Sequence, residues 1–393
     1  MGKWLVKARY LPLVSKSLYN LQSRRLPDNL RQKTFTFAGP MIRYGLRRAL
    51  NRLRPGADME RIQRRWSIQL SNAMAKRGFG GATHLYSMLG ETRGLMVAAK
   101  TRGIVIVLEC YILPNADKIV AAEQARFPDW ERMENQPVAP DENDEHEKYW
   151  KLENFWSLPD FIIAPSEAVR DDVMKISGIP AERIAVVPYG VNASWLDLDS
   201  RPVPRRVLFV GTADLRKGIH YLAAAAEKLA AKNIHCEFRV AGNVPPQIAR
   251  RPDCRLLNFL GRVPRERIAE EYLLADVFVL PSLAEGSAEA TYEALASGLP
   301  VITTRAAGSV VRDGIEGRIV PERDASALAD AIEELVGNRA LRDQMALAAR
   351  ERARDYTWEK YGGRLISALN SFGSKSAHLK CPEHIATPTK RLI

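Results

Sequence analysis

The fold is decided by residues 280–302, which read LPSLAEGSAEATYEALASGLPVI. The apolar run that ends at Leu280 predicts a buried strand, and a loop of small residues follows it. A helix is predicted from Ala288 until Gly298 stops it, directly before the strand that begins at Pro300. Strand, loop, helix and strand in this order are typical of a parallel α/β sheet.

The same alternation runs through the rest of the second half of the chain. It favours a doubly wound sheet with helices on both faces. The predicted strands are residues 206–211, 237–241, 256–260, 277–280 and 300–303, and the predicted helices are residues 219–231, 266–274, 288–296, 325–335, 342–354 and 356–369.

A shorter alternation precedes it in the first half. Ser166 is placed to cap a helix that runs to Ile176, because its side-chain oxygen can accept from an amide of the first turn. Residues 193–205 are rich in Asp and Pro and are typical of an interdomain linker. The predicted strands of this half are residues 83–88, 104–108, 161–164 and 184–187, and a further helix is predicted over residues 92–100.

One candidate anion site is residues 211–218, GTADLRKG, between a predicted strand and a predicted helix. At such a junction we expect free backbone N–H groups and the positive end of the helix dipole to face the carboxyl edge of the sheet. Arg216 and Lys217 add two positive charges, and a guanidinium fork is suited to phosphate oxygens.

The second candidate lies in the stretch that decides the fold. Glu285 is in the predicted loop and Glu293 is on the predicted helix, so their carboxylates are expected at the mouth and on the inner wall of one cleft. Between them, small residues leave the helix N-terminus open for a phosphate to approach. Those residues are Gly286, Ser287 and Ala288.

Together these motifs resemble the family 4, or group 1, retaining glycosyltransferases. The stretch from Glu285 to Glu293 resembles the E-x7-E signature of that family, and residues 211–218 resemble its phosphate loop. The resemblance covers residues 83–370 and implies the GT-B fold, an α/β fold of two facing Rossmann-like, doubly wound domains with a deep cleft between them.

The resemblance also implies the domain boundaries. We expect an N-terminal, acceptor-side domain at residues 1–195 and a C-terminal domain that binds a nucleotide sugar at residues 204–355. A helix at residues 356–371 is expected to cross back to the first domain, and residues 372–393 are expected to form a flexible tail.

Residue roles follow from the resemblance, position by position. Arg216 and Lys217 would hold the diphosphate of the donor, Glu285 would bind hydroxyls of the transferred sugar, and Glu293 would bind the ribose. Val263 would lie against the base. The donor-binding set is completed by Gly211, Gly286, Ser287, Ala288, Glu289 and Ala290, with amides of the last three residues facing phosphate and sugar.

The expected reaction is hexosyl transfer from a UDP-, GDP- or ADP-sugar to a glycan or a lipid-linked acceptor, with retention, in the synthesis of surface polysaccharide or lipopolysaccharide. Because cationic side chains and a helix terminus can stabilise the leaving diphosphate, no metal and no cofactor are expected. The chain also has no D-x-D motif in a plausible loop.

The first domain departs from the family pattern. Residues 1–60 contain no adjacent glycines, so the usual glycine-rich loop near the acceptor is missing. Where many relatives have a histidine after the second strand, this chain has Glu109. Two interpretations stay open: Glu109 acts in catalysis near the sugar, or it is an acid that merely ends a strand.

Charge is concentrated at the start of the chain. The formal net charge is +12, and residues 1–54 hold thirteen Lys or Arg against one acid. Apolar residues at helical spacing between Ile42 and Leu53 predict a helix there. It either lies on an anionic membrane surface or packs on the first domain.

Other classes of protein fit less well. A nucleic-acid-binding protein is disfavoured because the basic excess is confined to residues 1–54 and no binding motif is present. A sugar-nucleotide epimerase, or a relative that only binds sugar nucleotides, remains the alternative. No secretory signal or apolar run of membrane-spanning length is apparent, so we expect a cytoplasmic protein, with a possible peripheral contact at the inner face of the plasma membrane.

Overall fold

A computed structural model of the chain describes residues 59–90, 93–131 and 155–376. The chain divides into two compact units, residues 1–78 and 79–393, and the described part of the first contains helix α5 (Met59–Arg77). The predicted helix between Ile42 and Leu53, and the predicted membrane contact of residues 1–54, lie outside the described residues.

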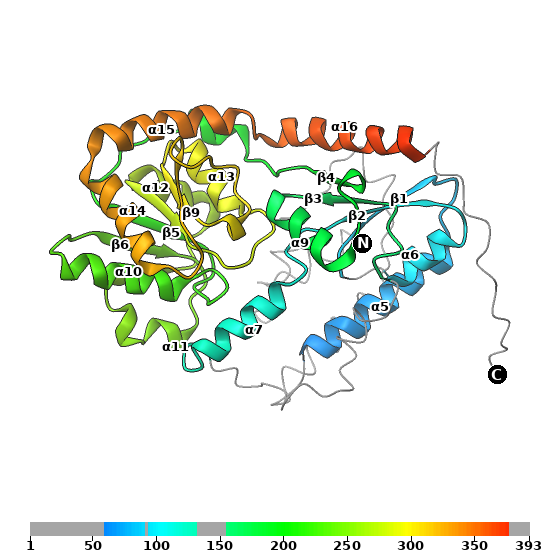
Figure 1. Cartoon of the computed structure of the whole chain (residues 1–393), viewed down its shortest axis with the longest axis horizontal. Helices are drawn as coiled ribbons and strands as arrows, with labels where there is room; N and C mark the ends of the chain where they lie inside the picture. Colours follow the sequence, from blue (N-terminus) through cyan, green and yellow to red (C-terminus); the bar gives the residue numbers. More distant parts are fainter. Residues whose placement is uncertain (1–58, 91–92, 132–154, 377–393) are drawn as a thin grey trace, which may run out of the picture. The chain divides into compact units, whose positions relative to one another are not determined.

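The second unit begins with a parallel sheet of four strands in the order β1-β2-β3-β4 (Figure 1). Each strand predicted for this half is present within two residues of its expected ends. The hydroxyl of Ser166 accepts from the amide of Val169, as predicted for a helix cap. The elements are β1 (His84–Met88), α6 (Arg93–Lys100), β2 (Val105–Glu109), α7 (Ala116–Arg126), β3 (Phe161–Ala164), α9 (Glu167–Ser177) and β4 (Ile184–Val186).

Helix α7 is an element that the sequence did not predict. Its buried residues are Ala116 and Glu123, so it has no apolar stripe for periodicity to detect. It follows β2 in the chain and precedes the undescribed residues 132–154.

A larger parallel sheet follows, with six strands in the order β10-β9-β8-β5-β6-β7. The short edge strand β10 was not predicted, because its sequence, Gly-Arg-Ile, contains no apolar run. The strands are β5 (Arg206–Val210), β6 (Glu237–Ala241), β7 (Leu257–Gly261), β8 (Val277–Leu280), β9 (Val301–Thr303) and β10 (Gly317–Ile319).

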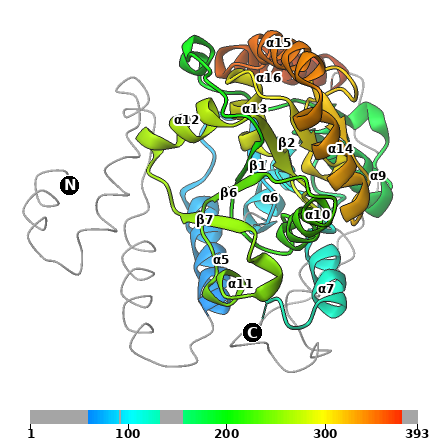
Figure 2. The same ribbon diagram turned by 90° about the vertical axis from the view of Figure 1, so that its left-hand side faces the viewer.

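Helices cover both faces of this sheet, which buries β8 completely. Helix α10 packs against α14, and α13 packs against α15. Figure 2 shows these two pairs around the strands. The helices are α10 (Ile219–Ala231), α11 (Pro246–Ala249), α12 (Arg265–Leu274), α13 (Glu289–Ala296), α14 (Ala325–Gly337) and α15 (Arg339–Arg354).

The last helix, α16 (Trp358–Ser376), packs against the first sheet. Phe372 is buried, and its ring stacks on Phe161 of β3 with centroids 4.3 Å apart. The helix therefore continues past residues 369 and 371, the two ends expected from the sequence, and Phe372 belongs to the helix. The apolar contact with β3 holds the extra turns in place.

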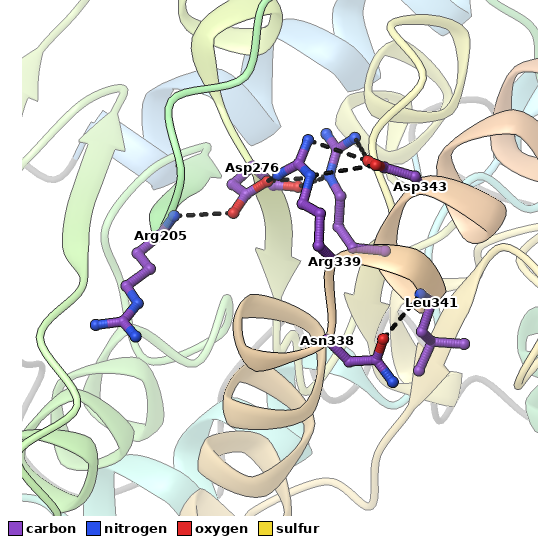
Figure 3. A network of polar contacts seen from close by, with 7 residues as sticks. Arg205, Asp276, Asn338, Arg339, Leu341 and Asp343 are labelled. Atoms are coloured by element: carbon purple, nitrogen blue, oxygen red, sulfur yellow. Dashed lines mark hydrogen bonds and ion pairs between the residues drawn. The ribbon is translucent and has the colours of Figure 1, made fainter.

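A buried carboxylate ties the first turn of α15 to the second sheet (Figure 3). Asp276 precedes β8 and accepts from the backbone N–H of Arg205 over 2.8 Å. Its other oxygen lies 2.7 Å from Arg339 Nη1 and 3.0 Å from Arg342 Nε. This network stands at the amino end of β8, away from the loops at the carboxyl end.

Candidate functional site

The order of the second sheet reverses between β5 and β8. The chain continues from β5 to β6 and β7 on one side, and from β8 to β9 and β10 on the other. In open α/β sheets, ligands bind outside the carboxyl ends of the strands at such a switch point. The loops at this place are residues 211–218 after β5 and residues 281–288 after β8, which are the two motifs singled out in the sequence.

Both cations of the first loop meet the loop glutamate of the second. Lys217 Nζ lies 2.6 Å and Arg216 Nη1 lies 2.7 Å from the same oxygen, Oε1 of Glu285. All three side chains are largely shielded, with exposed fractions of 14%, 27% and 13%. Two positive charges thus share one carboxylate, while the carboxylates of Asp214 and Glu131 accept from amides of the same loop.

The backbone of the first loop differs from expectation. We predicted free amides in residues 211–218, but most of these N–H groups already donate to groups of the protein. The amide of Lys217 donates to Asp214 Oδ1, and that of Leu215 donates to Glu131 Oε1. The amides of Gly211, Ala213, Asp214 and Gly218 donate to backbone carbonyls. Anion binding here must therefore rest mainly on Arg216 and Lys217.

Two glycines let this loop fold tightly. Gly218 has φ 72° at the start of α10, and a Cβ there would collide with the carbonyl oxygen of Pro281. A Cβ on Gly211 would meet the side chain of Lys217, which crosses over it. The glycines thus bring the two loops together and leave room for Lys217 to reach Glu285.

Residues 306–308 hold the second loop in place through hydrogen bonds. The amides of Glu285 and Ala288 donate to the carbonyls of Ala306 and Ala307. The hydroxyl of Ser287 donates to the carbonyl of Gly308 over 2.8 Å. Ala288 and Ser287, both predicted to face the donor, thus already have partners inside the protein.

Residues of the first sheet's connections also hold this loop. The hydroxyl of Ser166 donates to the carbonyl of Gly286 over 2.6 Å. A Cβ on Gly286 would collide with the carbonyl of Tyr111, so the two backbones are in close contact. Sequence reasoning identified Ser166 only as a helix cap and did not find Tyr111, because these contacts join segments far apart in the chain.

Helix α13 carries the second acid of the motif. Glu293 is half-buried and accepts from the hydroxyl of Tyr272 over 2.8 Å. Burial raises the pKa of Glu293, the bond from Tyr272 opposes this, and the charge of Glu289 adds to the rise. Glu289 itself is exposed at the first position of α13, followed by the half-buried Ala290.

Val263 lies just beyond β7, which β6 separates from β5. Its side chain is half-buried against the core of the second sheet. A ligand held at Arg216 would have to extend across the end of β6 to reach it.

Glu109 ends β2 and is buried, and two tyrosine hydroxyls donate to it. The bond from Tyr86 to Oε2 is 2.6 Å long, and that from Tyr189 to Oε1 is 3.0 Å long. Burial, together with the neighbouring carboxylate, raises the pKa of both tyrosines well above their usual value. The hydroxyls therefore stay protonated as donors, and neither oxygen of Glu109 is without a partner.

Two cavities have no residue of these loops in their lining, although one of them adjoins the first turn of α10. One, of about 620 Å³, is lined by aromatic rings and by residues of α10, among them Phe127, Trp130 and His220. The other, of about 510 Å³, lies beside β10 and α14. Neither is lined by a predicted donor-binding residue.

Some further structural features bear on ligands and membranes. Within the described ranges, no three His, Cys, Asp or Glu side chains are arranged to hold a metal ion. In the same ranges, no helix combines the length and the apolar character needed to cross a membrane. Metal independence stays a prediction.

Two family models match the chain over the segments that form this site. Residues 204–338 match Glycosyl transferases group 1, and residues 108–195 match Glycosyltransferase Family 4. The chain is 27% identical over 240 residues to alpha-D-kanosaminyltransferase of Streptomyces kanamyceticus, covering 54% of this chain and 60% of that protein. It is 32% identical over 186 residues to D-inositol 3-phosphate glycosyltransferase of Corynebacterium urealyticum, covering 43% and 44%. The matches thus span less than two thirds of these relatives' length.

Solved structures share the fold at low sequence identity. Sucrose-phosphate synthase from Thermosynechococcus elongatus has a TM-score of 0.59 at 21% identity, with 82% of each chain covered. The lipopolysaccharide outer core galactosyltransferase WaaB has a TM-score of 0.56 at 15% identity, covering 81% of this chain and 82% of that one. With two parallel sheets and both family models in chain order, the protein has the GT-B fold and belongs to the family 4, group 1 glycosyltransferases.

Proposed function

We propose that the protein transfers a hexose from a nucleotide-diphosphate sugar to a glycan or lipid-linked acceptor, with retention and without a metal ion. The observation that carries this proposal is the convergence of Arg216, Lys217 and Glu285 at the switch point of the second sheet. Similarity to the colanic acid glycosyltransferase WcaL of Salmonella typhimurium, described as putative, supports a role in surface polysaccharide synthesis.

The three side chains suggest how a donor would bind. In the absence of a donor, Glu285 neutralises part of the charge of Arg216 and Lys217. A diphosphate would take over these cations, since its oxygens carry more charge than one carboxylate. Glu285 would then be released to accept hydrogen bonds from hydroxyls of the sugar beside the diphosphate.

The same cations would serve the chemical step. When the bond between the anomeric carbon and the phosphate oxygen breaks, its electron pair goes to the diphosphate. Arg216 and Lys217 would stabilise that developing charge, and an oxygen of the acceptor would form the new bond as its proton passes to the leaving phosphate oxygen. Glu109 would orient the acceptor or sugar through Tyr86 and Tyr189 rather than act as a free base, because both of its oxygens accept from those hydroxyls.

The bound forms of a fold relative guide the choice of ligands. Structures of Anabaena HepE contain UDP or UDP-glucose. We therefore propose a uridine, guanosine or adenosine diphosphate sugar as the donor, with UDP-sugars the first to test.

The test is the shift in melting temperature of the protein with UDP, GDP, ADP and their sugars, with and without EDTA. Ligands that bind only the folded protein raise its melting temperature. We expect one nucleotide to give an EDTA-insensitive shift and to yield labelled product with a glycan or lipid extract. A shift in melting temperature without any product would favour a binding protein. A shift accompanied by isomerised donor would favour an epimerase.

Variants connect the test to the site. Lys217→Ala should remove most of the shift, and Glu285→Ala should abolish transfer of the sugar. Lys232→Ala is the matched control, because Lys232 also pairs with acids, Asp330 and Glu333, but on the exposed end of α10. Unchanged turnover in both Lys217→Ala and Glu285→Ala would contradict the proposed site.

A further inference from the structure

Helix α7 and the residues after it contact helix α10 and loops beside the second sheet through carboxylates. Glu123 is the one charged residue among the buried positions of α7, and its side chain has no exposed surface. An ionised carboxylate removed from water costs several kcal/mol unless it is paired and hydrogen-bonded. Its partners therefore show which segments of the protein the helix positions.

Besides Arg126 of α7 itself, 3.5 Å from Oε2, the partners of Glu123 lie in the first turn of α10 and just before α14. The hydroxyl of Tyr221 donates to Oε1 over 2.5 Å, and His220 Nε2 lies 3.0 Å from the same oxygen. Arg323 Nε donates to Oε2 over 2.7 Å. These hydrogen bonds outweigh desolvation and lower the pKa of Glu123, so the carboxylate stays charged.

Arg323 adopts an unusual backbone conformation to make its contact. Its φ of 65° lies in the left-handed region, which costs a non-glycine residue about 1 kcal/mol or more. The strain fits a residue whose side chain must reach one fixed partner.

These contacts fall next to the candidate phosphate loop. His220 and Tyr221 form the first turn of α10, which begins directly after Gly218. Glu131, a few residues beyond α7, accepts from the amide of Leu215 inside the loop over 2.6 Å. The segment from Ala116 to Glu131 thus contacts the loop itself at Leu215. It also contacts the helical turn after the loop at His220 and Tyr221.

We propose that Glu123 and Glu131 are positioning residues, which hold residues 211–221 in the shape that presents Lys217 and Arg216 to the donor diphosphate. The inference rests on the proposed function for the identity of the ligand. Neither carboxylate would touch the donor. Glu131 acts through the Leu215 amide, and Glu123 acts through the first turn of α10.

Substitutions of Glu131 can separate the effect of its charge from the effect of its hydrogen bond. Glu131 places a negative charge near a loop proposed to bind an anion, so its value to the loop must lie in accepting from Leu215. Glu131→Gln retains an oxygen acceptor and removes the charge, whereas Glu131→Ala removes both. If Glu131 did not hold the loop through this hydrogen bond, the two variants would behave alike.

The first measurement is hydrogen exchange of the backbone amides in residues 211–221 of the full chain without ligand. Glu123→Gln and Glu131→Ala should each speed exchange there by about tenfold, which corresponds to about 1.4 kcal/mol. Glu131→Gln should stay close to the unchanged protein. Glu316→Gln is the matched control, because Glu316 is equally buried and paired with an arginine, Arg312, but lies beside β10.

The second measurement is calorimetric titration with the nucleotide diphosphate that stabilises the unchanged protein. Glu123→Gln and Glu131→Ala should weaken binding by about tenfold, while Glu131→Gln should bind as well or better. Unchanged exchange in residues 211–221, or an equal increase of exchange there in Glu316→Gln, would overturn the positioning role whether or not a nucleotide binds. Altered exchange with no nucleotide bound by the unchanged protein would instead count against the proposed donor.

Discussion

Gly218 shows how one residue sets the geometry of the candidate site. Its φ of 72° favours glycine, and a Cβ would also strike the carbonyl of Pro281 in the neighbouring loop. The strain and the collision are separate costs. A second glycine allows them to be separated, because Gly261 has φ 66° and a Cβ added to it would meet nothing within 4 Å.

We predict that Gly218→Ala lowers the free energy of unfolding by about 3 kcal/mol, and that Gly261→Ala lowers it by about 1 kcal/mol. The first value adds backbone strain to overpacking, and the second contains strain alone. Urea unfolding of the two variants measures both. Equal losses would show that the Pro281 carbonyl moves aside without cost.

His220 makes stability depend on pH. Burial lowers the pKa of His220 to about 4, although the Glu123 carboxylate opposes this shift. The unfolded chain, with an ordinary pKa of about 6.5, therefore takes up a proton on acidification before the folded protein does. His220 thus destabilises the folded protein as the pH falls from about 6.5 to 4.

We predict that His220→Gln flattens this part of the pH profile by about 3 kcal/mol, because glutamine retains an N–H toward Glu123 but does not titrate. The measurement is the free energy of unfolding at several pH values between 7 and 4 for both proteins. Parallel profiles would mean that His220 takes up its proton as readily in the folded protein as in the unfolded chain. The lowered pKa of Glu123, to which hydrogen bonds from Tyr221, His220 and Arg323 contribute, adds a further loss at lower pH.

At the scale of elements, α15 depends on a buried ion-pair network (Figure 3). Arg342 is 5% exposed in its side chain and Asp276 is 3% exposed, so each is costly to leave unpaired. A surface pair for comparison joins Arg318 of β10 to Glu334 of α14, with side chains 29% and 39% exposed.

We predict that Asp276→Ala lowers the free energy of unfolding by about 4 kcal/mol. The substitution removes the carboxylate of Asp276, but the guanidinium of Arg342 stays buried. Glu334→Ala should cost less than about 1 kcal/mol, because its pair is solvated. Chemical denaturation checks both values. A small effect of Asp276→Ala would mean that water or Asp343 replaces the lost partner.

Elements also differ in how well the sequence predicts them. The strands around β8 and helix α13 were predicted because buried strands are apolar and helices in contact with a sheet have an apolar face. Helix α7 escaped prediction because its main buried contact is a carboxylate. Its stability depends on partners about a hundred residues away in the chain.

At the scale of the whole molecule, the most unusual property is the distribution of charge. Residues 1–54 carry the entire formal excess of +12, so residues 55–393 are neutral in sum. Basic segments bind anionic lipid surfaces with a strength that falls as salt screens the charges. An acceptor linked to lipid would then be close to the enzyme.

We predict that the full chain sediments with vesicles containing anionic lipid and is released as the salt concentration rises. One control is the full chain with vesicles of neutral lipid, and the other is a chain without residues 1–54 with vesicles containing anionic lipid. In neither control should the protein sediment with the vesicles. Equal sedimentation of the shortened chain would place the membrane contact elsewhere or make it independent of charge.

The sequence by itself determined most of the strands and helices along the chain, though not α7 or β10, and the two loops that carry the candidate site. Such features depend on residues close together in the chain, namely apolar runs, glycines at turns and caps at helix starts. Arg216, Lys217 and Glu285 were singled out on that basis, with the family resemblance assigning their roles.

Only the tertiary structure decided which groups meet. Lys217 and Glu285 are 68 positions apart, and they touch because β5 and β8 are neighbours in the sheet. Most of the loop amides that local reasoning left free already have partners, one of them Glu131. Partners of this kind are fixed by strand order and by the need to pair buried polar groups across the fold, and neither leaves a pattern in a short stretch of sequence.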